Sequence, residues 1–263
     1  MIIIAGPCQH ENLDLSLEIA SECKRACDLY EIEYYFKASF DKANRTSIDG
    51  ERGLGLDKSM LDFRIMKEKI EGLKIVTDVH SENQIETITN NYNDCVDVIQ
   101  IPAFLCRQTD LIKSACSTDK KINIKKGQFI SPFEVEGILS KTTDMSNVWI
   151  TERGTSFGYN NLIVDFTALD YMLDNYECEI FFDATHSVQK PGVNGKSTGG
   201  NRKYVPGLLR AASALGIQNF FIETHPDPDR SPSDGPNMIY LSDFSRVVGE
   251  ILRFNYNKSL GSF

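Results

Sequence analysis

The sequence predicts a single (β/α)8 barrel of the TIM type. Two observations support this prediction. Short runs rich in β-branched and aromatic residues alternate strictly with amphipathic helical runs, and neighbouring parallel strands need a crossover of this kind. The alternation repeats eight times within the 263 residues, which suits a closed barrel better than an open sheet. No linker, repeat or low-complexity tract divides the chain, so we expect residues 1–263 to form one catalytic domain.

The predicted strands are the short runs of β-branched and aromatic residues. The chain begins with the first of them, because Met1 to Ala5 is too short for the core of a signal peptide and has no positive leader. In chain order, the predicted strands are Ile2–Ala5, Tyr34–Ala38, Lys74–Asp78, Val96–Ile101, Lys121–Lys125, Val148–Glu152, Glu179–Asp183 and Asn219–Glu223.

The predicted helices are the amphipathic segments that separate these strands. In chain order, they are Leu13–Tyr30, Lys58–Ile70, Glu82–Tyr92, Arg107–Cys116, Pro132–Lys141, Leu162–Tyr176, Tyr204–Leu215 and Leu241–Phe254. The long polar segments 40–57, 187–203 and 225–240 each follow a predicted strand, so we expect them to be loops of the catalytic face.

Composition excludes several classes of protein. The net charge of −9 argues against a nucleic-acid partner, although a local cluster of cations can still attract an anionic substrate. With 41% hydrophobic and 25% charged residues, the chain is expected to be a soluble globular protein, and no apolar run is long enough to cross a membrane. The seven cysteines include no CxxC pair, and without a secretory signal they indicate the reducing cytoplasm.

Every predicted strand is followed by polar or reactive residues. The carboxyl ends of the strands of a barrel lie on one face, which is where barrel enzymes have their active sites. We therefore expect one active face formed by these groups. They are Gly6-Pro7-Cys8, Lys37, Asp78 with His80, Gln100 with Pro102 and Ala103, Lys125 with Lys126, Glu152 with Arg153, Asp183 with His186, and Glu223 with His225.

The segment that follows the second strand has the composition of a phosphate site. Three cations and several hydroxyl and amide donors come within a few residues, and such groups bind phosphate through charge-assisted hydrogen bonds. A solvated basic loop is the alternative. We favour it less, because Lys37 directly follows an apolar run, where an unpaired lysine would be costly. The residues concerned are Lys37, Ser39, Lys42, Asn44, Arg45 and Thr46.

The active face carries more positive charge than one monophosphate requires, so two anionic substrates are expected. Ion pairs with Asp41, Asp78 and Glu152 are an alternative use for some of these cations, and we expect both uses, with the carboxylates orienting the cations. The cations are Lys37, Lys42, Arg45, Lys125, Lys126, Arg153 and Arg202.

A metal site is a second possibility on the same face. A thiolate, an imidazole and two carboxylates suit a divalent ion such as Zn²⁺, Fe²⁺, Co²⁺ or Mn²⁺. The first, seventh and eighth strands become neighbours when the barrel closes, so Cys8, His186, Glu223 and Asp234 can converge. The alternative is a buried cysteine with scattered carboxylates. His10 and His80 are competing ligands, whereas His225, followed by Pro226, is expected to form hydrogen bonds within its own loop.

Several motifs, in order along nearly the whole chain, resemble one enzyme family. The first is the run from Lys37 to Arg45, Lys-Ala-Ser-Phe-Asp-Lys-Ala-Asn-Arg. The others are Ile75–His80, Ile99–Leu105, Arg107–Leu111, Ile122–Lys126, Glu152–Leu162, Asp183–His186, Thr198–Arg202, Glu223–Asp229 and Asp234–Pro236. Together they resemble the 3-deoxy-D-manno-octulosonate 8-phosphate synthases, also named 2-dehydro-3-deoxyphosphooctonate aldolases.

The resemblance implies the condensation of phosphoenolpyruvate with D-arabinose 5-phosphate and water, a step of Kdo and lipopolysaccharide biosynthesis that releases inorganic phosphate. It also implies a homotetramer, because Arg45 and Thr46 would bind the phosphate of arabinose 5-phosphate in the neighbouring subunit's site. Lys42, Lys125 and Arg153 would hold phosphoenolpyruvate, and Lys37 and Asn44 would contact the arabinose phosphate. The remaining substrate contacts implied are Ser39, Asp78, Gln100, Pro102, Ala103 and Arg202, with His186 also catalytic.

The family divides into metal-dependent and metal-independent members, and the latter carry Asn where this chain has Cys8. Cys8 therefore resembles the metal-dependent type, which implies one divalent ion held by Cys8, His186, Glu223 and Asp234. Two positions depart from the family pattern, since Thr46 replaces a usual Ser and Asn201 a frequent Arg. The glycine-rich segment from Gln189 to Arg202 is a candidate lid.

Three alternatives stay open at this stage. The 3-deoxy-D-arabino-heptulosonate 7-phosphate synthases share the metal set, but they typically carry Lys-Pro-Arg-Thr-Ser where Ala43 and Asn44 precede Arg45 here. A Schiff-base aldolase would use Lys37 or Lys125 as its nucleophile. A barrel that only binds a sugar phosphate would bind its ligand without releasing phosphate.

Overall fold

The computed structural model confirms the predicted barrel and describes residues 1–43, 50–192 and 199–255. Eight parallel strands follow one another around the sheet, and the first also pairs with the last, which closes the barrel. The strands are β1 (Ile2–Gly6), β2 (Glu33–Lys37), β3 (Lys74–Asp78), β4 (Val98–Ile101), β5 (Lys121–Lys125), β6 (Val148–Glu152), β9 (Glu179–Asp183) and β12 (Asn219–His225).

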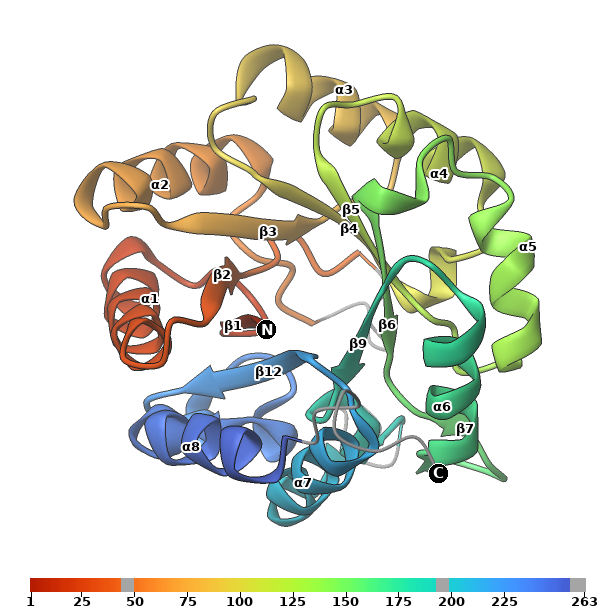
Figure 1. Ribbon diagram of the computed structural model, residues 1–263. Helices are drawn as coiled ribbons and strands as arrows, with labels where there is room; N and C mark the ends of the chain where they lie inside the picture. Colours follow the sequence, from red (N-terminus) through yellow and green to blue (C-terminus); the bar gives the residue numbers. More distant parts are fainter. Residues whose placement is uncertain (44–49, 193–198, 256–263) are drawn as a thin grey trace.

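Helices surround this barrel, as Figure 1 shows. α1 and α8 pack against each other outside the seam where β1 meets β12. The helices are α1 (Leu13–Asp28), α2 (Leu56–Lys69), α3 (Glu82–Asn91), α4 (Thr109–Cys116), α5 (Val135–Leu139), α6 (Phe166–Asn175), α7 (Val205–Leu215) and α8 (Phe244–Phe254). Among the described residues, we find no helix with the length and apolar character needed to cross a membrane.

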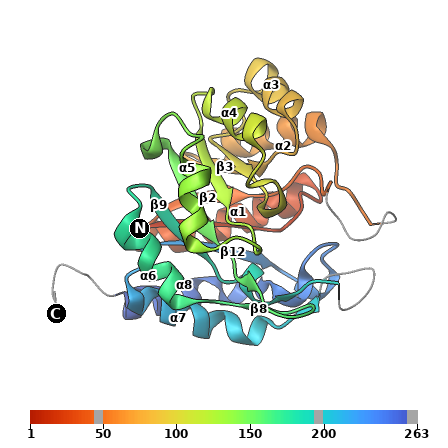
Figure 2. The same ribbon diagram turned by 90° about the vertical axis from the view of Figure 1, so that its right-hand side faces the viewer.

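The observed boundaries differ from the predicted ones mainly where a cap or a hairpin ends an element. The predicted helix Leu162–Tyr176 was wrong at its start, because Leu162–Ile163 forms β8, which pairs with β7 (Thr155–Ser156) in a hairpin. The helix begins only after Asp165, whose carboxylate accepts hydrogen bonds from two backbone N–H groups of the first turn. In the side view of Figure 2, β8 lies away from the N-terminal end of β1, at the end of the barrel toward which the strands run.

Two further short strands form a hairpin after β9. β10 (Gln189–Lys190) pairs antiparallel with β11 (Gly199–Gly200), within the predicted lid segment. The segment between these two strands includes residues 193–198, which lie outside the described residues, so the lid stays a prediction. A last strand, β13 (Ile239–Tyr240), pairs with the end of β12.

The barrel has two separate apolar cores. The larger one lies between the strands and the helices, and a smaller one fills the interior of the barrel. The interior core consists of Ile4, Tyr35, Val76, Val98, Trp149, Phe181 and Phe221, all buried. Trp149 packs against both Tyr35 and Phe181 in this core.

A polar layer lies directly above the interior core. Side chains alternate along a strand, so the residue two positions after each interior apolar residue also faces inward. Near the carboxyl ends of the strands, these inward positions are polar and buried. They are Lys37, Asp78, Gln100, Thr151, Asp183 and Glu223. The sequence of each strand therefore places an apolar support under a charged surface.

Three polar residues of this layer are linked side by side across β4, β5 and β6. The Asn123 amide donates to Gln100 Oε1 at 2.9 Å, and the Thr151 hydroxyl donates to Asn123 Oδ1 at 2.6 Å. Because each partner is buried and paired, this chain of hydrogen bonds stabilises the polar layer instead of burying unpaired groups.

Gly6 permits the close approach of β1 and β2 beneath the site. A Cβ atom at this position would lie 2.2 Å from the carbonyl oxygen of Lys37. Any side chain here would force the two backbones apart at the point where Cys8 and Lys37 enter the active face.

We predict that Gly6→Ala lowers the free energy of unfolding by about 1–3 kcal/mol, because the backbone must move to admit the methyl group. Denaturant unfolding measures this change. The matched control is Gly137→Ala in α5, where an added Cβ meets nothing within 4 Å. This control should be neutral or stabilising by up to ~1 kcal/mol. Equal stability of Gly6→Ala and wild type would contradict the steric account.

Candidate functional site

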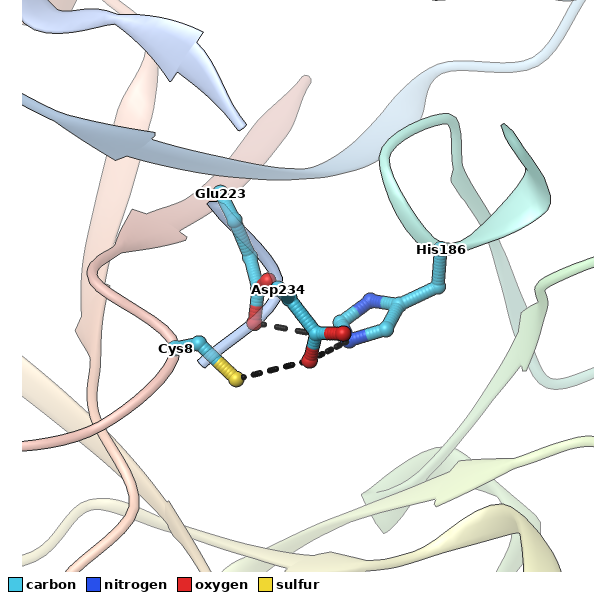
Figure 3. Close-up of side chains that lie close together, drawn as sticks. All are labelled: Cys8, His186, Glu223 and Asp234. Atoms are coloured by element: carbon cyan, nitrogen blue, oxygen red, sulfur yellow. Dashed lines mark hydrogen bonds and ion pairs between the residues drawn. The ribbon is translucent and has the colours of Figure 1, made fainter. Parts of the chain in front are cut away.

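Four potential metal ligands converge at the carboxyl ends of the strands. Their ligand atoms all lie within 4.8 Å of one another, although the residues are spread from position 8 to position 234. Figure 3 shows the side chains pointing toward a common centre: Cys8 from the segment after β1, His186 from the turn after β9, Glu223 from β12 and Asp234 from the following loop.

The distances between these atoms suit a common small ion. Cys8 Sγ lies 3.1 Å from Asp234 Oδ2, and His186 Nε2 lies 3.5 Å from Glu223 Oε1 and 3.8 Å from Asp234 Oδ2. Both carboxylate oxygens of Glu223 are buried and have no hydrogen-bond partner among the described residues. A buried carboxylate without partners is costly, and a cation at this centre would neutralise it.

The surroundings of the Cys8 thiol make its ionisation depend on a nearby cation. Its burial and the nearby Glu223 carboxylate raise the pKa of Cys8 well above the ordinary value for a thiol. The free thiolate is therefore disfavoured here, and a bound divalent cation would stabilise it. A thiolate, an imidazole and two carboxylates form a donor set that suits Zn²⁺ or another divalent transition ion.

Asp183 determines which nitrogen of His186 faces the centre. His186 Nδ1 lies 2.6 Å from Asp183 Oδ2, so Nδ1 carries the hydrogen and donates a hydrogen bond to the carboxylate. Nε2 then directs its lone pair toward the other three ligand atoms. A carboxylate behind a histidine ligand in this way fixes both the tautomer and the ring orientation.

The loop that carries Asp234 has an unusual backbone. Asp234 has φ 54° and ψ 16°, in the left-handed region, and a Cβ at the next residue, Gly235, would lie 2.2 Å from the carbonyl oxygen of Pro228. Gln189 donates to Asp234 Oδ1 at 2.7 Å, and Arg202 donates to the carbonyl oxygen of Gly235 at 2.8 Å. The hairpin after β9 therefore holds this ligand in place.

The histidines considered as competing ligands lie outside this cluster. His10 is buried between Ser16 Oγ, 2.8 Å from Nδ1, and Asp62 Oδ2, 3.0 Å from Nε2. His80 approaches Asp78 Oδ2 at 3.5 Å and contacts none of the four ligands. Both were therefore wrong as ligands of this cluster.

His225 forms the local hydrogen bond that was predicted. The backbone N–H of Asp227 donates to His225 Nδ1 at 2.9 Å, which confirms a bond within the loop. The other nitrogen, Nε2, lies 3.2 Å from Glu11 Oε1 and ties this loop to the segment after β1.

Lys37, Ser39 and Lys42 form one hydrogen-bonded group beside the cluster. Ser39 Oγ accepts from Lys37 Nζ at 3.0 Å and from Lys42 Nζ at 2.8 Å. Lys37 Nζ lies 3.8 Å from Glu223 Oε1 and 4.0 Å from Asp78 Oδ1. Contacts with Lys37 and Lys42 outweigh the effect of burial and lower the pKa of Asp78 to about 2. The predicted pairing of cations with carboxylates is thus confirmed for Lys37 and Asp78.

Lys125 is linked to the cluster through Asp183, the partner of His186. Its Nζ lies 2.5 Å from Asp183 Oδ2 and 3.1 Å from the centre of the Phe221 ring. Burial lowers the pKa of Lys125 to about 8, although Asp183 opposes this effect. Arg153 is also buried; it donates to Gln189 Oε1, and its Nη1 has no hydrogen-bond partner among the described residues. These two cations therefore have bonding capacity left for an anion.

Two members of the predicted cation set have other partners. Lys126 Nζ lies 3.1 Å from Glu152 Oε2, which is the predicted pairing with Glu152. Arg202 lies 2.5 Å from Asp229 Oδ1 and stacks on the Tyr240 ring at 4.9 Å. The contacts of Arg202 stabilise the Asp234 loop. The third predicted partner, Asp41, pairs with the exposed Arg52 among the residues that the structure describes.

Gln100, Pro102 and Ala103 lie where the sequence placed them, at the end of β4. Gln100 accepts from Asn123, and Pro102 precedes the short 3-10 helix Ala103–Leu105. Asn44, Arg45 and Thr46 lie outside the described residues. Asn201 caps the turn after β11, where its side chain accepts from the backbone N–H of Lys203 at 3.1 Å.

Sequence reasoning placed Asp183 on the active face but assigned it no role in binding or catalysis, and it missed Gln189 as a site residue. Each touches one cation and one potential metal ligand: Asp183 contacts Lys125 and His186, and Gln189 contacts Arg153 and Asp234. The signal for Asp183 was its position at an inward-facing strand end, like Lys37 and Glu223. No signal in the sequence pointed to Gln189.

The fold and the site together define a barrel enzyme with a cationic active face and a cluster of four potential metal ligands. The family model described as the DAHP synthetase I family matches residues 1–252, and the chain belongs to that family.

Several relatives within the family carry one printed name, 2-dehydro-3-deoxyphosphooctonate aldolase. The protein of that name from Caulobacter vibrioides (strain NA1000 / CB15N) is 49% identical over 255 residues, which cover 96% of this chain and 87% of that protein. The one from Rhodopseudomonas palustris (strain TIE-1) is 48% identical over 96% of this chain and 87% of its own length. The one from Bartonella quintana (strain Toulouse) is 47% identical over 97% of this chain and 90% of its own length. This similarity confirms the resemblance inferred from the motifs.

Proposed function

We propose that this enzyme condenses phosphoenolpyruvate with D-arabinose 5-phosphate and water to give 3-deoxy-D-manno-octulosonate 8-phosphate and inorganic phosphate. The observation that carries the proposal is the convergence of three cations, the buried Lys125 and Arg153 and the half-buried Lys42, with the four-ligand cluster on one face of the barrel. The names of relatives that share about half of their residues with this chain support it. The heptulosonate synthase alternative gains no support from those names.

Substrate binding is assigned to the cations on the two sides of the cluster. Lys42, Lys125 and Arg153 would hold the phosphate and carboxylate of phosphoenolpyruvate, and Lys37 would contact the arabinose phosphate. Ser39 orients two of these ammonium groups. Asn44, Arg45 and Thr46, assigned to the arabinose phosphate, are proposed from the sequence motif alone. The remaining assigned contacts are Asp78, Gln100, Pro102, Ala103 and Arg202.

In the proposed reaction, carbon 3 of phosphoenolpyruvate bonds to the aldehyde carbon of the pentose, and the carbonyl oxygen takes up a proton. Water adds its oxygen to carbon 2, and the bond from carbon 2 to the phosphate oxygen then breaks. The enzyme's cations hold two mutually repelling anions in contact, and proximity of this kind is worth roughly 7–11 kcal/mol. Cys8, His186, Glu223 and Asp234 would hold a divalent ion, which would supply the Lewis acidity needed to orient an aldehyde or to lower the pKa of water.

A homotetramer is part of the proposal. Four aromatic side chains on the loops after β4, β5 and β6 are exposed: Phe104 by 58%, Phe129 by 53%, Phe157 by 67% and Tyr159 by 99%. Exposed apolar groups on neighbouring loops favour an interface with another protein surface. Light scattering on the purified protein should give four chains per particle.

A cytoplasmic location is proposed as well, since all seven cysteines are free thiols.

A Schiff-base aldolase is the second candidate, because the lowered pKa of Lys125 would favour a nucleophilic amine. The contact with Asp183 favours the ammonium form instead. Borohydride reduction in the presence of substrate separates the two, since a covalent adduct on Lys125, seen by mass spectrometry, would support the aldolase.

Substrate identity is tested by phosphate release from phosphoenolpyruvate with a panel of aldose phosphates. We expect arabinose 5-phosphate to be turned over faster than erythrose 4-phosphate, and a chelator to abolish the reaction. Faster turnover of erythrose 4-phosphate would favour the heptulosonate synthase, and unchanged activity with chelator would remove the metal from the proposal.

Cys8→Ala should lose metal and activity together. Removal of one of four ligands is expected to weaken metal binding by at least about 100-fold, more than the usual loss of an outer partner. Elemental analysis and phosphate release on the same sample measure both. Cys106→Ala, which changes another buried thiol, is the matched control and should keep both properties. Full activity in metal-free Cys8→Ala would contradict the assignment of a catalytic metal to this cluster.

The affinity for phosphoenolpyruvate should fall as the pH rises above about 8. The pKa of Lys125 is lowered to about 8, so the ammonium form that binds an anion is present below this pH and is lost above it. If only the ammonium form binds, the Michaelis constant for phosphoenolpyruvate rises by up to about tenfold per pH unit. Initial rates between pH 6.5 and 9.5 measure it. Lys125→Arg, which stays charged, should flatten the profile, whereas a flat wild-type profile would contradict the assignment.

A further inference from the structure

The carboxylate of Asp183 touches one group from each half of the site. Its Oδ2 accepts from Lys125 Nζ at 2.5 Å and from His186 Nδ1 at 2.6 Å. Its Oδ1 accepts from the Thr185 hydroxyl at 3.0 Å and from the backbone N–H of His186 at 2.9 Å. One oxygen is therefore shared between a cation assigned to phosphoenolpyruvate and a histidine of the four-ligand cluster.

This carboxylate stays charged although it is fully buried. Each of its oxygens accepts two hydrogen bonds, one of them from the Lys125 ammonium group, and these bonds compensate for the burial of the charge. A buried anion with two donors on one oxygen divides its charge between them, so a stronger donor on one side leaves less charge for the other.

We propose that Asp183 is a positioning residue that couples the two halves of the site. A divalent ion on His186 Nε2 makes Nδ1–H a stronger donor, and this draws the charge of Asp183 toward the imidazole. The ion pair between Asp183 and Lys125 is then weaker, so the Lys125 ammonium group has more of its hydrogen-bonding capacity free for the anionic substrate. By linkage, phosphoenolpyruvate tightens metal binding by the same factor as the metal tightens phosphoenolpyruvate. This inference rests on the proposed function, because it takes phosphoenolpyruvate as the anion at Lys125.

A second side chain that bridges a cation and a potential ligand provides a contrast. Gln189 also bridges a cation and a potential ligand, Arg153 and Asp234, but its amide is neutral. A neutral amide orients both groups and carries no charge to redistribute. Among the described residues that bridge the two halves in this way, the charge-dependent coupling is therefore assigned to Asp183.

The test measures binding without turnover. Phosphoenolpyruvate is titrated by calorimetry into metal-free and Zn²⁺-loaded protein, with no aldose present, and Zn²⁺ affinity is measured against a competing chelator. For wild type, we expect Zn²⁺ to tighten phosphoenolpyruvate at least about fivefold, within the usual range of coupling between sites. For Asp183→Asn, we expect weaker binding of both ligands and a coupling factor below about twofold.

Two further variants separate coupling from a structural effect. Thr185→Val removes the hydrogen bond to the unshared oxygen of Asp183 and the one from the backbone N–H of Glu223, and it should keep the wild-type coupling factor. Lys125→Met leaves Asp183 Oδ2 to His186, so it should bind Zn²⁺ at least as tightly as wild type but lose the coupling. This variant keeps the test decisive if Asp183→Asn does not fold.

The outcomes distinguish this inference from the proposed function. A wild-type coupling factor near one, with both ligands bound, would overturn the inference alone, as would an undiminished factor in Asp183→Asn or Lys125→Met. No binding of phosphoenolpyruvate to wild type in either form would overturn the proposed function and the inference together.

Discussion

The pairing of β1 with β12 is the constraint on which the site depends. It places Gly6 beside Glu223 in register, and so brings the segment after the first strand next to the last strand. Without this closure, Cys8 and Asp234 would be separated by nearly the whole length of the chain, and no local feature of the sequence would bring them together. The barrel thus converts residues that are distant in sequence into neighbours on one face, and the interior core of Trp149 and its neighbours keeps that face rigid.

Much of the fold and part of the site could be predicted because their causes are local. The alternation of side chains along a strand determines which residue faces inward, so Lys37, Lys125 and Glu223 were identified from their own strands. The two-residue strands of the small hairpins were missed, since segments this short show no periodicity. Asp183 was expected on the active face, but its role was missed because that role depends on Lys125, which lies 58 positions earlier in the chain. His10 was misjudged as a ligand for the same reason, since Asp62, 52 positions away, holds its ring elsewhere.

Charge balance in the polar layer follows one principle. A buried cation is costly unless an anion or a dipole lies beside it, and the described structure provides such a partner for Lys37, Lys125 and Lys126. Arg153 differs, because its described hydrogen-bond partner is the neutral side chain of Gln189. Three of these cations are therefore largely neutralised by their partners, whereas Arg153 keeps an unpaired nitrogen, Nη1, among the described residues. An anionic substrate gains more binding free energy from Arg153 than from a cation that is already paired.

The four potential ligands do not stand on equally rigid parts of the molecule. Glu223 belongs to a barrel strand, and Cys8 and His186 follow strands closely, whereas Asp234 lies on a loop in the left-handed backbone region. Ions of different radius need different ligand distances, and a loop adjusts its position at lower cost than a strand within a closed sheet. Tolerance for more than one metal would then be a property of this one loop, and its substitution could narrow the choice of ion without any change to the barrel.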